Sequence, residues 1–336
     1  MNAELEQLKH LGFLKIFKES YNLIVSKWRH IFSKIFLVFI FPFCFLILAD
    51  MILTDHLSLS IAGKTINLLD DYEPTNMYNR QMKHDRDVHS ILLGVFTLLY
   101  FLIGLVVFYL FAISAISYVV ACIYASKDTN LKQAIRVVLK AWKKLVVTYL
   151  WNFVIQFVYI GVFVALAVAC VVIGSREGKL IIGIVIGVIL FISFVVGLIY
   201  FNVIWSLASV VSVLEECYGL QAFKRSRDLM KGKKKLCIGI YMVFQVLLVI
   251  IQGGYFTLAL FLFPVFVYVI AGIVFFVPLL GVVLLGFVVQ TVLYLVLKSY
   301  QNEGIDKSSL GAQLDGYLGP QGRPISGRKN VQLNEV

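Results

Sequence analysis

The chain has 336 residues and a formal net charge of +11 at pH 7, and 60% of its residues are hydrophobic while 15% are charged. A soluble globular domain has about 45–50% apolar and about 25% charged residues. This composition, with a mean hydropathy of +0.89, argues against a water-soluble fold and predicts a protein whose solvent is largely lipid.

Long runs without Asp, Glu, Lys or Arg predict six transmembrane helices. A hydrocarbon core of about 30 Å needs about 20 helical residues, and the last run is long enough for two spans, divided near Pro264. The runs show no strict polar–apolar alternation, so helices are favoured over a barrel. The charge-free runs cover residues 35–49, 90–126, 145–175, 180–214 and 236–297. The predicted spans are residues 33–53, 91–122, 146–173, 181–213, 236–261 and 267–297.

The distribution of Lys and Arg predicts the orientation of these spans. The segment up to Lys34, the loops at 127–144 and 224–235, and the tail from Lys298 hold 24 of these residues, and the two opposite loops hold 6. By the positive-inside rule both termini are expected in the cytosol. The net charge is then a topology signal, and no nucleic-acid partner is expected. The host membrane, endomembrane system or plasma membrane, stays open.

The remaining segments complete an all-α fold, a polytopic transmembrane helical bundle with three cytosolic amphipathic interfacial helices. Residues 1–32 form a cytosolic N-terminus, residues 33–297 the six-helix domain and residues 54–89 an exoplasmic loop. The Gly-rich tail at 298–336 is expected to be mostly disordered.

A basic amphipathic helix precedes three of the predicted spans, in segments 1–32, 129–144 and 219–232. Apolar residues recur at every third or fourth position, which predicts one apolar stripe on each helix. Asp128 or Thr129 is the expected N-cap of the second helix. The stripes comprise Phe13, Phe17, Tyr21, Ile24, Trp28 and Ile31 in the first helix, Leu131, Ile135, Val138, Trp142 and Leu145 in the second, and Leu220, Phe223, Leu229 and Met230 in the third.

The three basic helices also align with one another and predict an internal threefold repeat. Trp28-Arg29 aligns with Trp142-Lys143. The first and third copies match at Leu14, Phe17, Lys18, Ser20 and Leu23, which align with Leu220, Phe223, Lys224, Ser226 and Leu229.

Basic residues on these helices are candidates for contact with anionic lipid headgroups. Each Lys or Arg near an anionic leaflet contributes about 1 kcal/mol. The alternative is that the helices only anchor the topology and seal the bundle. The candidate contacts are Lys15, Lys18, Arg29, Lys132, Arg136, Lys140, Lys143, Lys224, Arg225, Arg227 and Lys231.

Inside the predicted spans no ionisable residue lies deep in the membrane, which argues against an ion-coupled carrier. Amide side chains at Asn152, Gln156, Asn202 and Gln290 are expected to form hydrogen bonds between helices. If they instead converge on one cavity, the protein would be a transporter or channel for a neutral or amphipathic solute.

No catalytic fingerprint is present, so the sequence predicts a protein that is not an enzyme and that binds no cofactor or metal. Glu215 and Glu216 are expected to lie in water and to offset the basic loop that follows. The loop residues His84, Asp85, Asp87 and His89 have no standard metal-ligand spacing. Cys122, Cys217 and Cys237 lie near the cytosolic boundary, where palmitoylation is an alternative to simple packing.

Three stretches resemble a plant family of six-span integral membrane proteins without assigned activity. They are SVLEECYGLQAFKRSRDLMKG at 212–232, WKKLVVTYLWN at 142–152, and KSYQNEGIDKSS at 298–309 with YLG at 317–319. The resemblance implies a six-span membrane protein. The basic helices and the absence of catalytic motifs predict a non-enzymatic membrane component that engages anionic lipids or partner proteins, in membrane organisation or trafficking. This prediction leaves a protein partner or homo-oligomer open.

A shorter pattern, Ala222-x-x-Arg225-Ser226-x-x-Leu229-x-x-Gly232, is similar to one in the membrane region of bacterial glycerophosphodiester phosphodiesterases. That region accompanies a soluble catalytic domain, which this chain lacks. The resemblance therefore implies a fold and transfers no catalytic residue.

Overall fold

The computed structural model describes residues 12–25, 29–50, 77–127, 129–176, 180–215, 217–261 and 265–301. These residues are almost entirely helical and none of them lies in a strand, which confirms the predicted all-α fold. The helices are α2 (Phe13–Val25), α3 (Arg29–Ile35), the π-helix η1 (Phe36–Ile40), α5 (Met77–Tyr124), α6 (Leu131–Arg176), α7 (Leu180–Leu214), α8 (Leu220–Leu229), α9 (Lys234–Phe261) and α10 (Val265–Tyr300).

Six helical segments are long and apolar enough to cross a membrane, as predicted. In lipid every backbone N–H and C=O needs a partner within the protein, and an uninterrupted helix supplies these partners from its own segment. The chain is therefore an integral membrane protein. The segments are His30–Asp50, Leu102–Tyr124, Leu131–Val172, Gly183–Leu214, Lys234–Leu258 and Gly272–Tyr300.

Two helices extend beyond their expected limits. The amphipathic segment expected at 129–144 is the first part of α6, which continues without a break into the span, because no glycine or proline interrupts the sequence there. Helix α5 begins at Met77, so the last part of the expected loop at 54–89, including His84, Asp85, Asp87 and His89, is helical. The rest of that loop and the expected tail beyond residue 301 lie outside the described residues.

The chain divides into two compact units, and each is described by itself. The first contains Met1–Phe32, Ile113–Phe244 and Gly286–Val336, and the second contains Ser33–Ala112 and Gln245–Leu285. Helices α5, α9 and α10 contribute to both units.

Aromatic side chains hold the second unit together. Its first span contains η1, in which the N–H of Phe41 bonds to the carbonyl of Phe36. Pro42 follows directly and has no N–H to donate, and a local π-turn is one way for a span to accommodate a proline. The ring pairs are Phe39–Phe111 at 6.3 Å, Phe41–Phe276 at 5.4 Å, Phe43–Tyr109 at 6.0 Å and Tyr255–Phe275 at 6.4 Å between centroids.

The buried core of the first unit is built from the C-terminal parts of α5, α7 and α10. The Oγ atom of Ser117 lies 3.2 Å from Oγ1 of Thr291 and joins α5 to α10. The side-chain amide of Gln290 donates to Oγ of Ser209 at 2.9 Å and to the carbonyl of Ser206, which joins α10 to α7. Small hydroxyl side chains thus allow these helix ends to approach closely, as is usual between helices in membranes.

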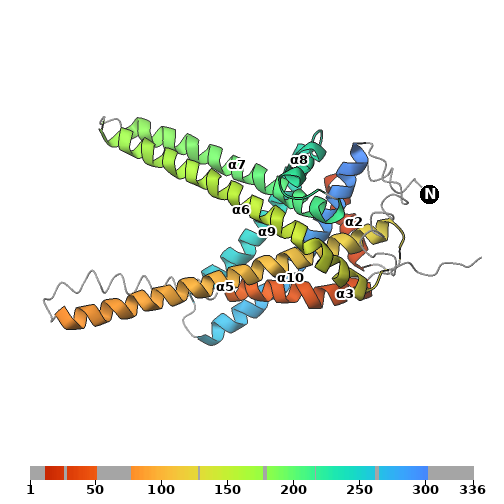
Figure 1. Ribbon diagram of the computed structural model, residues 1–336, viewed down its shortest axis with the longest axis horizontal. Helices are drawn as coiled ribbons and strands as arrows, with labels where there is room; N and C mark the ends of the chain where they lie inside the picture. Colours follow the sequence, from red (N-terminus) through yellow and green to blue (C-terminus); the bar gives the residue numbers. More distant parts are fainter. Residues whose placement is uncertain are drawn as a thin grey trace, which may run out of the picture. The chain divides into compact units, whose positions relative to one another are not determined.

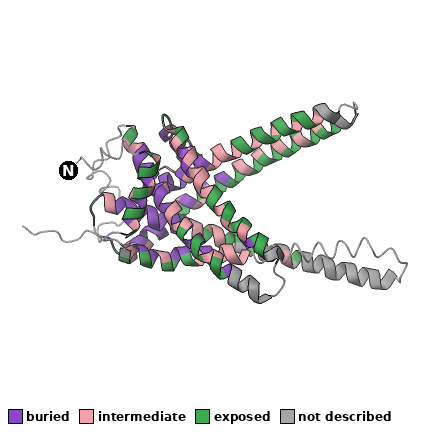
Figure 2. Ribbon diagram, turned by 180° about the vertical axis from the view of Figure 1, so that it is seen from behind, coloured by how far each residue is buried: buried purple, intermediate pink, exposed green. Residues whose placement is uncertain are grey.

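Helices α6 and α7 form a hairpin in the same unit and run side by side (Figure 1). The ring of Phe194 stacks on those of Phe163 and Tyr159, with 3.9 Å and 5.3 Å between ring centroids. The hydroxyl of Tyr159 also donates a hydrogen bond to the carbonyl of Phe194. Large apolar side chains are exposed over residues 153–172 and 184–196 of the hairpin, and Figure 2 colours these stretches mainly as exposed or intermediate. Such a surface is suited to contact with lipid chains.

Candidate functional site

The three basic helices pack into the first unit through small side chains. Ser20 of α2, Ala134 of α6 and Ser226 of α8 are each 0% exposed. They occupy equivalent positions, because the alignment of Trp28 with Trp142 also aligns Ser20 with Ala134. Small residues on the inner face let each helix lie close to its neighbours.

The predicted apolar stripes are only partly buried. Val138, Leu145, Phe223, Leu229 and Met230 are buried, whereas Tyr21, Trp142 and Leu220 are 61%, 42% and 48% exposed, as expected for side chains at headgroup depth. In a water-soluble protein, the apolar stripe of a helix identifies its buried face. In a membrane protein the large apolar side chains can face lipid, and the small ones face the protein.

Burial recurs from copy to copy and supports the internal repeat. The lysines at the equivalent positions Lys18, Lys132 and Lys224 are all exposed. One turn beyond the small residue, the apolar residues are all buried: Leu23 is 9% exposed, Val137 1% and Leu229 0%.

Most of the predicted headgroup contacts lie on the outer faces of these helices. Lys231 is exposed, and its Nζ lies 2.8 Å from Oδ1 of Asp228. Arg29 is the first residue of α3, but its side chain is not among those that the structure describes. Some exposed basic residues directly follow exposed leucines. Lys15 follows Leu14, which is 78% exposed, and Lys140 follows Leu139, which is 60% exposed. The exposed basic residues are Lys15, Lys18, Lys132, Arg136, Lys140, Lys143, Lys224, Arg227 and Lys231. A face that mixes exposed leucine with lysine and arginine is typical of helices at a membrane interface.

Arg225 differs from these residues because it binds Glu215. Its Nε lies 3.0 Å from Oε2 of Glu215, and both side chains are largely buried, at 26% and 10% exposure. On the other side of the carboxylate, Oε1 accepts hydrogen bonds from the Tyr294 hydroxyl at 2.7 Å and from Nζ of Lys298 at 3.2 Å. Glu215 thus joins the end of α7 to α8 and α10, so the expectation that it lies in water is wrong; Glu216 lies outside the described residues.

The ionisation of Glu215 reflects this setting. Burial alone would raise the pKa of its carboxyl group, but hydrogen bonds from Arg225 and Tyr294 and the charge of Lys298 outweigh burial and lower it. Glu215 therefore carries its negative charge at neutral pH.

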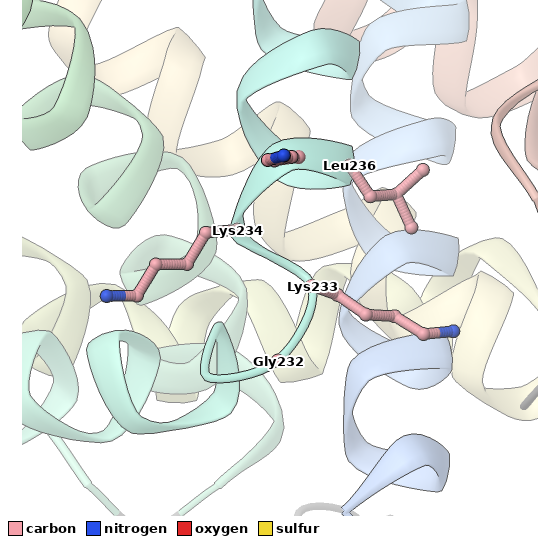
Figure 3. Close-up of a pocket in the computed structure, with 5 residues that line it drawn as sticks. Gly232, Lys233, Lys234 and Leu236 are labelled. Atoms are coloured by element: carbon pink, nitrogen blue, oxygen red, sulfur yellow. The ribbon is translucent and has the colours of Figure 1, made fainter.

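A pocket of about 450 Å³ lies at the turn between α8 and α9, lined by Gly232, Lys233, Lys234, Lys235 and Leu236. Gly232 has φ +91°, and a Cβ there would lie 2.8 Å from Cε1 of Tyr300, so the turn requires glycine. Lys233 extends toward α10, where its Nζ lies 4.7 Å from the centroid of the Tyr300 ring, and Lys234 extends to the opposite side (Figure 3).

Every charged residue that lines this pocket is basic. None of the five lining residues is acidic, and Lys234 and Lys235 are exposed. Burial lowers the pKa of Lys233, so a nearby anion would relieve the cost of keeping it charged. The headgroup contacts predicted from the sequence do not include Lys233, Lys234 or Lys235. The signal that would have identified them is a run of three lysines between a turn glycine and an apolar span.

The predicted intramembrane amides serve separate helix contacts. Gln156 donates from Nε2 to Oδ1 of Asn202 at 3.3 Å within the α6–α7 hairpin, whereas Gln290 binds α7 near its C-terminal end. Asn152 is 6% exposed, and its Oδ1 has no hydrogen-bond partner in the described part of the chain. This distribution argues against one amide-lined cavity and hence against the transport alternative.

Thiols and metal ligands add no further site to the described part of the chain. Cys122 and Cys237 are each 1% exposed, and Cys217 is half-buried. Within that part, no group of three or more His, Cys, Asp or Glu residues is placed to hold a metal ion.

The comparisons with known proteins give a family without an assigned activity. No curated protein and no solved structure matches the chain, so the resemblances to a plant family and to bacterial phosphodiesterases receive no support from them. Residues 1–336 match the family described as Domain of unknown function (DUF8558), and the chain belongs to that family.

Proposed function

We propose that this protein is a non-enzymatic membrane component that contacts anionic lipid headgroups through the outer faces of α2, the start of α6, and α8. One observation carries the proposal: Lys18, Lys132 and Lys224 stand at equivalent positions of three repeated helices and are all exposed. Topology alone would need positive charge on this side of the membrane, but not at the same exposed position of each repeat.

The proposed orientation places these faces and both termini in the cytosol. The excess of Lys and Arg on this side, 24 against 6, supports that orientation. Cytoplasmic leaflets carry anionic lipids, and each lysine near such a surface is worth about 1 kcal/mol of attraction. The resemblance to plant six-span proteins and a role in membrane organisation or trafficking stay predictions of the same proposal.

The exposed leucines on these helices support contact with lipid over contact with water. Leu14 and Leu220 are equivalent residues of the first and third copies, and they are 78% and 48% exposed. A leucine side chain on an interfacial helix contacts the boundary between the headgroups and the acyl chains. The ammonium groups of neighbouring lysines then lie at the level of the phosphates.

The experiment is an analysis of the lipids that accompany the protein in native nanodiscs. The test variant carries Lys18→Gln, Lys132→Gln and Lys224→Gln, which removes one equivalent charge from each repeat. Its matched control carries Arg80→Gln, Lys83→Gln and Arg86→Gln, which removes three charges from the opposite side of the membrane.

We expect anionic lipids to be enriched around the native protein and around the control, and to fall toward their bulk proportion around the test variant. The three lysines together account for about 3 kcal/mol of attraction at low salt. The same lipid profile around the native protein and the test variant would refute the proposal and return the basic helices to a role in topology.

A further inference from the structure

We propose that the pocket at the α8–α9 turn is a specific site for a phosphomonoester carried on a polyol ring, as in a phosphorylated inositol headgroup. This inference deepens the proposed function and rests on its claim that this side of the bundle faces anionic lipid. It adds a single saturable site to a diffuse basic surface.

Lysine chemistry selects the phosphate group. A phosphomonoester carries a charge of about −1.5 to −2 at pH 7 and has three acceptor oxygens, which suit ammonium groups that act as point charges. Lys233 and Lys234 extend from the turn to opposite sides (Figure 3), so both ammonium groups reach an anion at the turn by rotation of their flexible side chains. None of the five residues that line the pocket is acidic, and the nearby carboxylate of Asp228 is paired with Lys231.

Backbone geometry adds donors at the same place. The carbonyl of Lys233 accepts the N–H groups of Leu236 and Cys237 and so begins α9. The N–H groups of Lys234 and Lys235 have no carbonyl partner among the described residues and belong to the first turn of a 28-residue helix. They are therefore placed to donate to a phosphate oxygen once the lysine side chains have brought it there.

Size and position select the rest of the headgroup. Sites for small molecules have volumes of about 300–1,000 Å³, and at about 450 Å³ this pocket is larger than a lone phosphate requires. Leu236 supplies the one apolar side chain of the lining and stands at the beginning of a membrane span. A polyol ring fills the remaining space, with its glycerol and acyl chains directed along α9 into the lipid.

Lys233 is the residue whose environment an anion would change most. It is held over the Tyr300 ring, and burial lowers the pKa of its ammonium group. A phosphate beside it would raise that pKa again, and this coupling favours phosphorylated over unphosphorylated headgroups.

The experiment titrates the full-length protein, held in nanodiscs of phosphatidylcholine, and counts bound ligands by native mass spectrometry. The probes are dioctanoyl phosphatidylinositol 4-phosphate, dioctanoyl phosphatidylserine, inositol 1,4-bisphosphate and inorganic phosphate. The pocket variant carries Lys233→Gln, Lys234→Gln and Lys235→Gln, and its matched control carries Arg80→Gln, Lys83→Gln and Arg86→Gln, which removes three charges that belong to no proposed lipid contact.

We expect one phosphoinositide to bind the native protein saturably. Its affinity should fall about five-fold for each lysine removed and about a hundred-fold in the pocket variant, since each lysine contributes a similar increment. The matched control should stay within about three-fold of the native protein. Equal weakening in both variants, or phosphatidylserine binding as tightly as the phosphoinositide, would overturn the proposal.

Two further arms identify the source of the phosphate and protect against misfolding. If inositol 1,4-bisphosphate binds as tightly as the lipid, the natural ligand is soluble; if it binds more weakly, the acyl chains contribute and the ligand is a lipid. Gly232→Ala retains every lysine but distorts the turn, and it should weaken binding about ten-fold or more. Lys234→Glu alters one exposed side chain and replaces the pocket variant if that variant does not fold.

Failure of this inference is distinguishable from failure of the proposed function. Anionic lipid enriched in native nanodiscs, with no saturable phosphoinositide site, would remove the pocket and keep the basic surface. No enrichment around the native protein would remove the basic surface, whatever the result for the soluble ligands.

Discussion

At the scale of single residues, Glu215 is the polar link on which the first unit depends most. Its carboxylate accepts hydrogen bonds from Arg225, Tyr294 and Lys298 and so joins α7, α8 and α10. Removing the charge of Glu215 leaves the largely buried cations of Arg225 and Lys298 without their partner. Loss of one member of a buried ion pair destabilises a protein more than replacement of the whole pair does.

We predict that Glu215→Gln lowers the free energy of unfolding by about 2 kcal/mol, within the range for hydrogen bonds to charged groups. The pKa of Glu215 is below its ordinary value of 4.5. Its contribution is therefore complete above about pH 4.5 and is lost as the pH falls through the lowered pKa. Thermal unfolding in detergent across pH 3–7 tests both points.

The control for this prediction is Asp228→Asn, which removes the exposed Asp228–Lys231 pair and should not change stability measurably. A Glu215→Gln protein as stable as the native one, or one with the same acid transition, would show that the carboxylate does not join these helices.

Ser226 offers a second residue-scale prediction. It is fully buried, and its hydroxyl has no hydrogen-bond partner among the described residues. The equivalent residue of the second copy is Ala134, so alanine fits this position of the repeat. We predict that Ser226→Ala leaves the free energy of unfolding unchanged or raises it by up to about 1 kcal/mol. Ser226→Leu should lower it by about 1–3 kcal/mol, because the helix then cannot approach its neighbours.

The same thermal unfolding experiment measures both variants. A Ser226→Ala protein less stable than the native one by more than about 1 kcal/mol would mean that the hydroxyl has a partner. A tolerated Ser226→Leu would mean that α8 does not pack through this face.

At the scale of elements, charge-free runs were enough to predict the fold and the number of spans, because lipid admits few ways of satisfying a backbone. Helix limits were harder. The N-cap of α6 was expected at Asp128 or Thr129, but Asn130 precedes the helix, and its N–H is capped by the side chain of Gln133 at 3.1 Å. Capping of this kind depends on a residue three positions into the helix, and a search for a single cap residue overlooks it.

The small residues on the inner faces of the basic helices could be predicted only from the repeat. The apolar stripes include buried residues such as Leu229 and exposed ones such as Tyr21, whereas Ser20 and Ser226, which align with each other, are both fully buried. Glu215 could not be predicted, since its partners Tyr294 and Lys298 are about 80 residues away in the sequence. The three lysines at the α8–α9 turn were visible in the sequence, but the pocket depends on the turn at Gly232 and on the Tyr300 ring beside it.

At the scale of the whole molecule, a basic helix followed by a span recurs three times along the chain. In each copy, a basic helix buries small side chains, presents a lysine outward and leads into a span; the lysines are Lys18, Lys132 and Lys224. If these faces contact anionic lipid, selectivity for such lipid should depend on all three copies and should weaken with salt, since the Debye length falls to about 10 Å at 0.1 M.

The most direct measurement of this claim is the selectivity of the lipid shell, read by electron paramagnetic resonance. The protein is reconstituted in phosphatidylcholine vesicles with a trace of spin-labelled phosphatidylglycerol or spin-labelled phosphatidylcholine, and the motionally restricted fraction of each label is compared. We predict a larger restricted fraction for phosphatidylglycerol than for phosphatidylcholine at low salt, reduced by 0.5 M NaCl and by the Lys18→Gln, Lys132→Gln, Lys224→Gln variant. Equal restricted fractions of the two labels around the native protein at low salt would contradict this prediction.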